Sequence, residues 1–97
     1  MFPDDEILRL ETLANHSIDD HLISGKLFLT DRRLVFKSYE QEEYSWPLFK
    51  LQSFNFYPSF INQGGEFLIN YEGQKLPFEV NNIQLWKNAF PPLAANG

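Results

Sequence analysis

Two histidines and two aspartates lie close together in the first quarter of the chain, at His16, Asp19, Asp20 and His21. Imidazole and carboxylate groups are metal ligands, so these side chains supply enough donors for a metal ion in principle. Nothing in their spacing fixes a coordination geometry, because all four fall in one short polar segment. The chain has no Cys, which excludes thiolate ligands and thiolate nucleophiles. We therefore expect no metal site and no cofactor.

The same segment contains Ser17 and Ser24, so it holds the residue types of a hydrolytic triad. The chain has no Gly-x-Ser-x-Gly turn that would present a serine nucleophile, and no acid stands apart to orient a histidine base. We expect no catalytic residues and no enzymatic activity.

Basic residues are concentrated in one segment, where they are the candidate ligand-binding residues: Lys26, Arg32, Arg33 and Lys37. Nucleic-acid binding needs Lys and Arg gathered on one face. Here Asp31 interrupts the segment and the formal net charge is -5, so we expect no nucleic-acid partner. Arg33 points away from the neighbouring apolar positions, and it either braces the fold through a carboxylate or carbonyls, or binds a ligand.

A second candidate site is the aromatic stretch of residues 54–61, which has five large apolar residues in eight. One face of a strand cannot bury all of them. Either barrel curvature and a loop bury the rings, or some rings are exposed and form a protein-contact or self-association patch. The candidate contact residues are Phe54, Phe56, Tyr57 and Phe60.

Alternation of apolar and polar residues predicts four strands, over residues 26–30, 33–37, 66–71 and 76–80. Residues 7–14 favour an opening strand, with a helix as the competing interpretation, and residues 43–46 and 50–57 indicate two more. Asp31-Arg32 and Glu72-Gly73 leave room only for tight hairpin turns. Proline cannot donate to a ladder, so we expect Pro47 and Pro77 at a strand end, an edge or a bulge.

A helix is predicted after the last strand. Asn81 or Asn82 can cap it, and Ile83, Trp86 and Phe90 have the spacing of a buried helical stripe. Pro91-Pro92 stops the helix, and residues 91–97 are predicted to form a tail. We expect one domain over residues 1–97 with its core at about 5–90. Its fold would be a small barrel or sandwich whose open end is covered by the helix, with Trp86 buried.

Residues 25–36 (Gly-Lys-Leu-Phe-Leu-Thr-Asp-Arg-Arg-Leu-Val-Phe) resemble the second and third strands of GRAM and bacterial pleckstrin-homology-type domains. Residues 48–54 are similar to the fourth strand of these families, and Leu85-Trp86-Lys87 fits their capping helix. The resemblance covers about residues 5–90. It implies an all-β, pleckstrin-homology-like barrel of about seven antiparallel strands capped by one C-terminal α-helix.

The pleckstrin-homology superfamily implies phosphoinositide binding, which needs several Lys or Arg from the first two strands and their loop. The expected loop, residues 15–24, has two Asp and no Lys or Arg. We therefore predict a non-catalytic binding module whose partner is a protein. The alternatives are peripheral membrane lipid binding, through a headgroup or inserted aromatics, and a self-assembling structural domain.

The sequence also bears on location. The N-terminus is acidic, unlike a secretory signal, and no apolar run approaches the length of a membrane span. We predict a cytoplasmic protein, with peripheral membrane association as the alternative.

Overall fold

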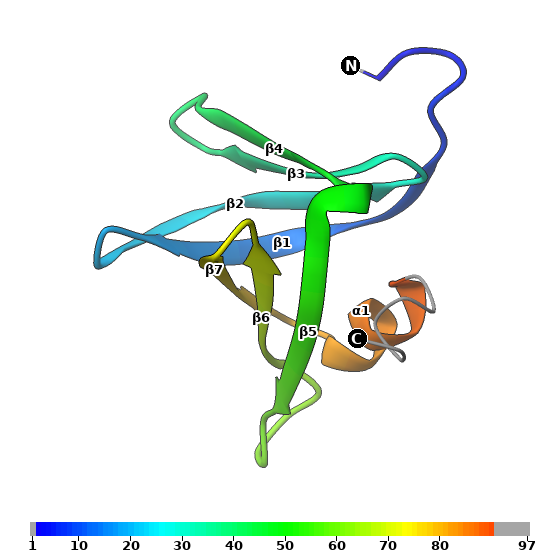
Figure 1. Cartoon of the computed structure of the whole chain (residues 1–97). Helices are drawn as coiled ribbons and strands as arrows, with labels where there is room; N and C mark the ends of the chain where they lie inside the picture. The colour runs from blue at the N-terminus through cyan, green and yellow to red at the C-terminus, as the bar shows by residue number, and fades with distance from the viewer. Residues whose placement is uncertain (1, 91–97) are drawn as a thin grey trace.

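The computed structural model describes residues 2–90, and the predicted tail (91–97) lies outside the described residues. Seven strands precede one helix (Figure 1). The elements are β1 (Leu8–Ile18), β2 (His21–Thr30), β3 (Arg33–Ser38), β4 (Glu43–Pro47), β5 (Leu51–Pro58), β6 (Gly65–Tyr71), β7 (Gln74–Val80) and α1 (Ile83–Ala89), with a 3-10 turn, Leu48–Lys50, between β4 and β5. The predicted fold class, all-β with one C-terminal helix, is confirmed.

The strands form one antiparallel sheet in the order β4-β3-β2-β1-β7-β6-β5. β1 joins its two halves, because it pairs with β2 along its whole length and with β7 only through Ala14–His16. The half formed by β5, β6 and β7 runs crosswise to the half formed by β1 to β4, so the sheet is strongly bent (Figure 1). β4 and β5 are its two edge strands.

The core lies inside this bend, where alternate residues of each strand point. The side-chain oxygen of Asn82 caps α1 by accepting from Leu85 N–H at 3.3 Å, and Trp86 is fully buried as predicted. The buried apolar cluster consists of Ala14, Leu27, Leu29, Leu34, Phe36, Trp46, Leu51, Phe67, Ile69, Leu76, Phe78, Val80, Ile83, Trp86 and Phe90.

Among residues 2–90, no helix is long and apolar enough to span a membrane.

Both prolines lie where the ladder does not need an N–H. Pro47 is the last residue of edge strand β4. Pro77 lies inside β7, immediately before Phe78 in the chain. Phe78 is the last residue of β7 that pairs with β1, so Pro77 is just outside that pairing. The Pro77 carbonyl accepts a hydrogen bond from His16 Nδ1 at 2.7 Å. The His16 side chain therefore links β1 to β7 just past the end of their backbone pairing.

The prediction of a long loop over residues 15–24 is wrong, and the predicted strand 7–14 is too short. β1 and β2 continue until only Asp19 and Asp20 separate them. Both have positive φ, 49° and 66°, as both central residues of a type I′ hairpin turn require. Asp tolerates this region better than most residues, so the two aspartates make the turn without glycine.

Candidate binding surfaces

Arg32 and Arg33 are held by the acidic N-terminal segment, which folds back over the β2–β3 turn. Arg32 Nη2 lies 2.8 Å from Asp5 Oδ2 at the surface. Arg33 contacts Glu6 through two hydrogen bonds, Nε to Oε2 at 2.9 Å and Nη2 to Oε1 at 3.2 Å. The Glu6 side chain is only 3% exposed, whereas that of Arg33 is 29% exposed. Arg33 therefore braces the fold through the Glu6 carboxylate, and a ligand-binding role for it stays a prediction.

Thr30 completes this buried ion pair. Its hydroxyl donates to Glu6 Oε2 at 2.6 Å and accepts from the backbone N–H groups of Arg32 and Arg33 at 3.0 Å. The hydrogen bond from Arg33, assisted by the one from Thr30, lowers the pKa of Glu6 below its ordinary value, although burial opposes the shift. The same contact raises the pKa of Arg33.

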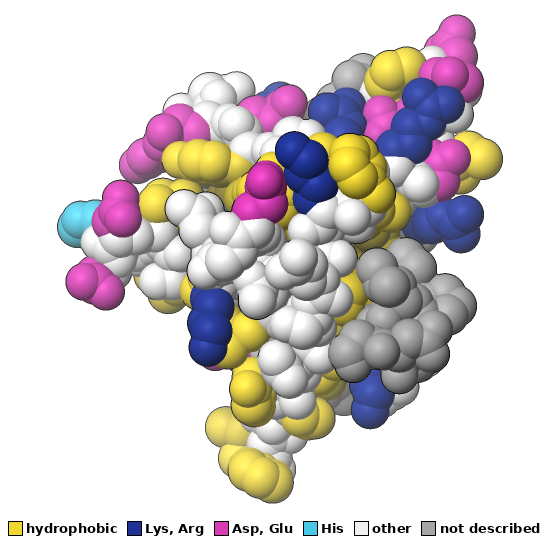
Figure 2. Space-filling view, viewed as in Figure 1, with side chains coloured by type: hydrophobic (Ala, Val, Ile, Leu, Met, Phe, Trp, Pro, Cys, Tyr) yellow, Lys and Arg dark blue, Asp and Glu magenta, His cyan; other side chains and the backbone are white. Residues whose placement is uncertain are grey.

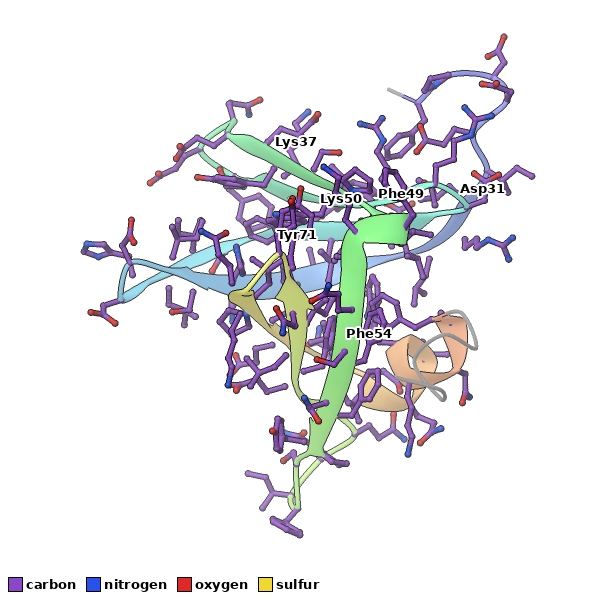
Figure 3. The ribbon with its side chains drawn as sticks, viewed as in Figure 1. Asp31, Lys37, Phe49, Lys50, Phe54 and Tyr71 are labelled. Atoms are coloured by element: carbon purple, nitrogen blue, oxygen red, sulfur yellow. The ribbon has the colours of Figure 1, made fainter. Side chains whose placement is uncertain are left out.

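Lys26 and Lys37 lie opposite each other on the outer face of β2 and β3. Lys26 Nζ approaches Glu11 Oε2 at 3.9 Å, and Lys37 lies opposite Glu43 on β4. Both lysines line a shallow hollow of about 300 Å³, whose lining does not include the arginines. Asp31 at the β2–β3 turn and Lys37 lie toward opposite ends of β3 (Figure 3). The four candidate ligand-binding residues are thus divided into two pairs, and three of the four contact the chain's own carboxylates.

Burial separates His16 from the other residues of the candidate metal site, which lie exposed at the β1–β2 turn. His16 is buried, with its ring stacked on Phe78 at 4.3 Å between centroids and in edge contact with Phe36 and Trp46. His21 is exposed at the start of β2. Among residues 2–90, no group of three or more His, Cys, Asp or Glu is arranged to hold a metal ion.

His16 makes the stability of the fold depend on pH. Burial lowers the pKa of His16, and the hydrogen bond to Pro77 only partly opposes this. Its neutral form is therefore favoured in the folded state, so the contribution is intact above the ordinary histidine value of 6.5 and is lost as pH falls through the lower folded pKa. We expect the melting temperature to fall between pH 7 and pH 5. The fall should be smaller in His16→Gln and unchanged in His21→Gln, and a fall of equal size in all three would contradict this assignment.

The aromatic stretch is divided by the pleat of β5. Phe54 and Phe56 are half-buried and face α1, with ring centroids 4.5 Å and 6.2 Å from that of Phe90 (Figure 3 shows Phe54 on this side). Phe54 and Phe56 are therefore only partly exposed, because residues two apart on a strand share a face and this face meets the helix. Their place in a contact patch stays a prediction. Tyr57 is half-exposed and Phe60 is fully exposed, as is its neighbour Ile61. Apolar atoms accordingly cluster at the β5–β6 tip in Figure 2.

The outer edge of β5 carries backbone groups that nothing among residues 2–90 pairs with, since β5 ends the sheet and bonds only β6. Ser59 N–H donates to the Gly64 carbonyl, which fixes the alternation along this ladder. In antiparallel pairs, every second residue turns its N–H and C=O away from the partner strand. Phe54 and Phe56 are these outward residues, and Pro58, the next, has no N–H to offer.

The edge of β5 also lacks charge. No residue of β5 is charged (Leu-Gln-Ser-Phe-Asn-Phe-Tyr-Pro). The opposite edge strand, β4, is five residues long, begins with Glu43 and follows the acidic residues Glu40 and Glu42. Natural sheets protect their edges from pairing with other chains by charge, proline and short length. By that standard the edge of β4 is protected, whereas that of β5 is protected only at Pro58.

Solved structures that resemble the chain in fold include two domains of other proteins. The Vps36 N-terminal PH domain matches 99% of this chain and 84% of its own length, with a TM-score of 0.77 and 14% sequence identity. The C-terminal domain of an unknown protein from Leishmania infantum matches 86% of this chain and 77% of its own length, with a TM-score of 0.65 and 18% identity.

The chain has a pleckstrin-homology-like fold. No protein-family model and no curated protein matches the sequence. The narrower resemblance to GRAM domains therefore stays a prediction, and these fold matches do not assign a ligand.

Proposed function

We propose that this protein is a non-catalytic, cytoplasmic binding module that takes up an extended segment of a partner protein as an added strand beside β5. The observation that carries the proposal is the edge of β5, eight residues without a charge, whose outward backbone groups at Phe54 and Phe56 have no partner among residues 2–90. Strand addition uses such an edge for affinity and the neighbouring side chains for specificity.

The surroundings of the edge suit an apolar segment. Phe54 and Phe56 are only half-buried, so a strand beside them would cover their exposed sides with every second side chain. Tyr57, Phe60 and Ile61 offer further apolar area at the end of β5. We expect the partner segment to alternate apolar and polar residues.

The test uses peptides selected from a random library displayed on phage. Their binding is measured to two variants of this protein that both lose the Phe56 ring. Phe56→Val and Phe56→Pro both remove the ring, and only proline also removes the outward N–H. One main-chain hydrogen bond contributes about 1 kcal/mol, so selected peptides should bind Phe56→Pro at least about fivefold more weakly than Phe56→Val. Melting curves check that both variants are folded. Equal binding to the two folded variants, or a selection that yields no binders, would refute strand addition at β5.

Self-association is the alternative use of the same edge, because two copies of β5 could pair with each other. Light scattering over a range of protein concentrations separates the two. A monomer that binds the selected peptides supports a partner protein. A dimer that dissociates in Phe56→Pro, while Phe56→Val remains dimeric, would assign the edge to self-assembly instead.

Binding to phosphoinositide membranes is expected to be weak and insensitive to the headgroup. Asp19 and Asp20 occupy the short β1–β2 turn, and Arg32 and Arg33 already contact Asp5 and Glu6. Salt screens any remaining attraction at the surface. Flotation of vesicles with a panel of phosphoinositides at ~0.15 M salt checks this. Micromolar binding to one headgroup, abolished by Arg33→Ala, would restore the membrane interpretation.

A further inference from the structure

A groove crosses the solvent-facing side of the sheet where its two halves meet. Its larger part is a hollow of about 610 Å³ over β5, β6 and β7, and its smaller part is a hollow of about 220 Å³ over β1 and β2. The two parts share Glu79 and Asn81. We call this feature the outer groove. Its lining includes Tyr57, Ser59, Asn62, Glu66, Glu79 and Asn81 in the larger part and Leu13, Asn15, Ser24 and Tyr39 in the smaller part.

The middle of the outer groove holds two carboxylates. Glu66 on β6 lies directly opposite Glu79 on β7, and both are exposed. No Lys or Arg is among the lining residues, and neither carboxylate forms an ion pair within residues 2–90. Like charges directly opposite each other destabilise a sheet. The free protein therefore carries an arrangement that a bound cation would relieve.

One of these carboxylates is held in position by neighbouring polar groups. Asn15 Nδ2 donates to Glu79 Oε1 at 2.9 Å, and Ser24 Oγ donates to Asn15 Oδ1 at 2.7 Å. Tyr57 lines the larger part of the outer groove, directly opposite Glu66, and Tyr39 lines the smaller part. Both tyrosines are more than half exposed. A carboxylate of fixed orientation, a second carboxylate beside it and an aromatic wall are the surroundings that a guanidinium prefers, because it is planar, donates in pairs and stacks on rings.

We propose that the outer groove binds an arginine side chain of a partner protein, with its guanidinium between Glu66 and Glu79 and against Tyr57. This site goes beyond strand addition at β5, since it lies on the face of the sheet and requires a charged ligand. Ca²⁺ is the less suitable occupant, because two carboxylates are too few for its six to eight oxygen ligands.

The test is a titration of the ¹⁵N-labelled full chain with the capped dipeptide acetyl-Arg-Arg-amide, followed by amide chemical shifts. The neutral probe, acetyl-citrulline-citrulline-amide, has the same shape without the charge. We expect shifts of the Glu66, Glu79 and Asn81 amides with the arginine probe, at millimolar affinity, and much smaller shifts with the citrulline probe. Absence of shifts in the outer groove, or equal shifts with both probes, would overturn the proposal.

Matched charge variants separate this site from general attraction to an acidic protein. Glu66→Gln/Glu79→Gln and Asp4→Asn/Glu40→Gln both change the formal net charge from -5 to -3. The groove variant should bind the arginine probe about five- to tenfold more weakly, whereas the control variant should bind it within about twofold of the unchanged protein. Equal weakening in both would mean that the probe senses only net charge, and would refute the site.

Thermal melting gives a readout that a merely structural pair would not share. Since Glu66 and Glu79 repel each other, Glu66→Gln should raise the melting temperature of the free protein by roughly 1–8 °C. When a charge serves binding and not folding, its removal is expected to make the free protein more stable and its complex with the ligand weaker. A lower melting temperature in Glu66→Gln would show that Glu66 stabilises the fold, and would count against the proposal.

Discussion

Replacing Trp86 with alanine is expected to lower the free energy of unfolding by about 3–5 kcal/mol, the usual loss for a fully buried large aromatic side chain. Trp86 is 0% exposed and stacks on Phe67 with centroids 5.7 Å apart. Its Nε1 donates to Thr12 Oγ1 at 3.1 Å, which ties α1 to β1. Because a domain of this size has only about 5–15 kcal/mol of stability in total, the variant should be largely unfolded at moderate temperature.

The measurement is chemical denaturation of Trp86→Ala beside Leu85→Ala, its neighbour on the same helix. Leu85 is 48% exposed, so its truncation should cost at most about 1 kcal/mol. If Trp86→Ala unfolded at the same denaturant concentration as Leu85→Ala, the assignment of Trp86 as the residue that closes the barrel would be wrong.

Arg33→Ala is expected to lower the free energy of unfolding by about 1–3 kcal/mol, because it leaves the buried carboxylate of Glu6 without its cation. The hydroxyl of Thr30 still donates to Glu6, and the Arg33 side chain is 29% exposed, so the loss should be smaller than for a fully buried pair. Arg32→Ala is the matched control. Its ion pair with Asp5 is exposed to solvent, and its removal should hardly change the melting temperature.

Acid titration gives a second readout of the same pair. The folded pKa of Glu6 lies below its ordinary value of 4.5. The stabilisation is therefore complete above 4.5 and is lost as pH falls through the folded pKa. Arg33→Ala should lose less stability than the unchanged protein over this acid range. Parallel curves for the two proteins would contradict the role given to Arg33.

Period-two alternation predicted the strands well, because a sheet with one buried face imposes it directly on the sequence. The hairpin around Glu72-Gly73 also defines the register of its two strands. A two-residue turn fixes which residues of β6 and β7 lie opposite each other, so the facing pair Glu66 and Glu79 follows from the turn alone. This pairing can therefore be predicted from the sequence alone.

Other features depend on contacts between distant residues. The sequence offers His16 as a metal ligand, whereas in the structure its ring is stacked on Phe78, which is far along the chain. Likewise, the acidic N-terminal segment shows no alternation that would indicate Glu6 as the partner of Arg33. Part of the division of the aromatic stretch can be predicted from the sequence, since Pro58 ends β5 and leaves Phe60 beyond the strand.

Amide hydrogen exchange along β5, with and without the tightest selected peptide, tests strand addition most directly. In the free protein the amides of Asn55 and Tyr57, which point toward β6, should exchange slowly, and those of Phe54 and Phe56 should exchange fast. In the complex, strand addition predicts that Phe54 and Phe56 become at least about tenfold slower, because each outward N–H gains an acceptor. Unchanged exchange at Phe54 and Phe56 in a saturated complex would contradict the proposal that the partner binds as a strand beside β5.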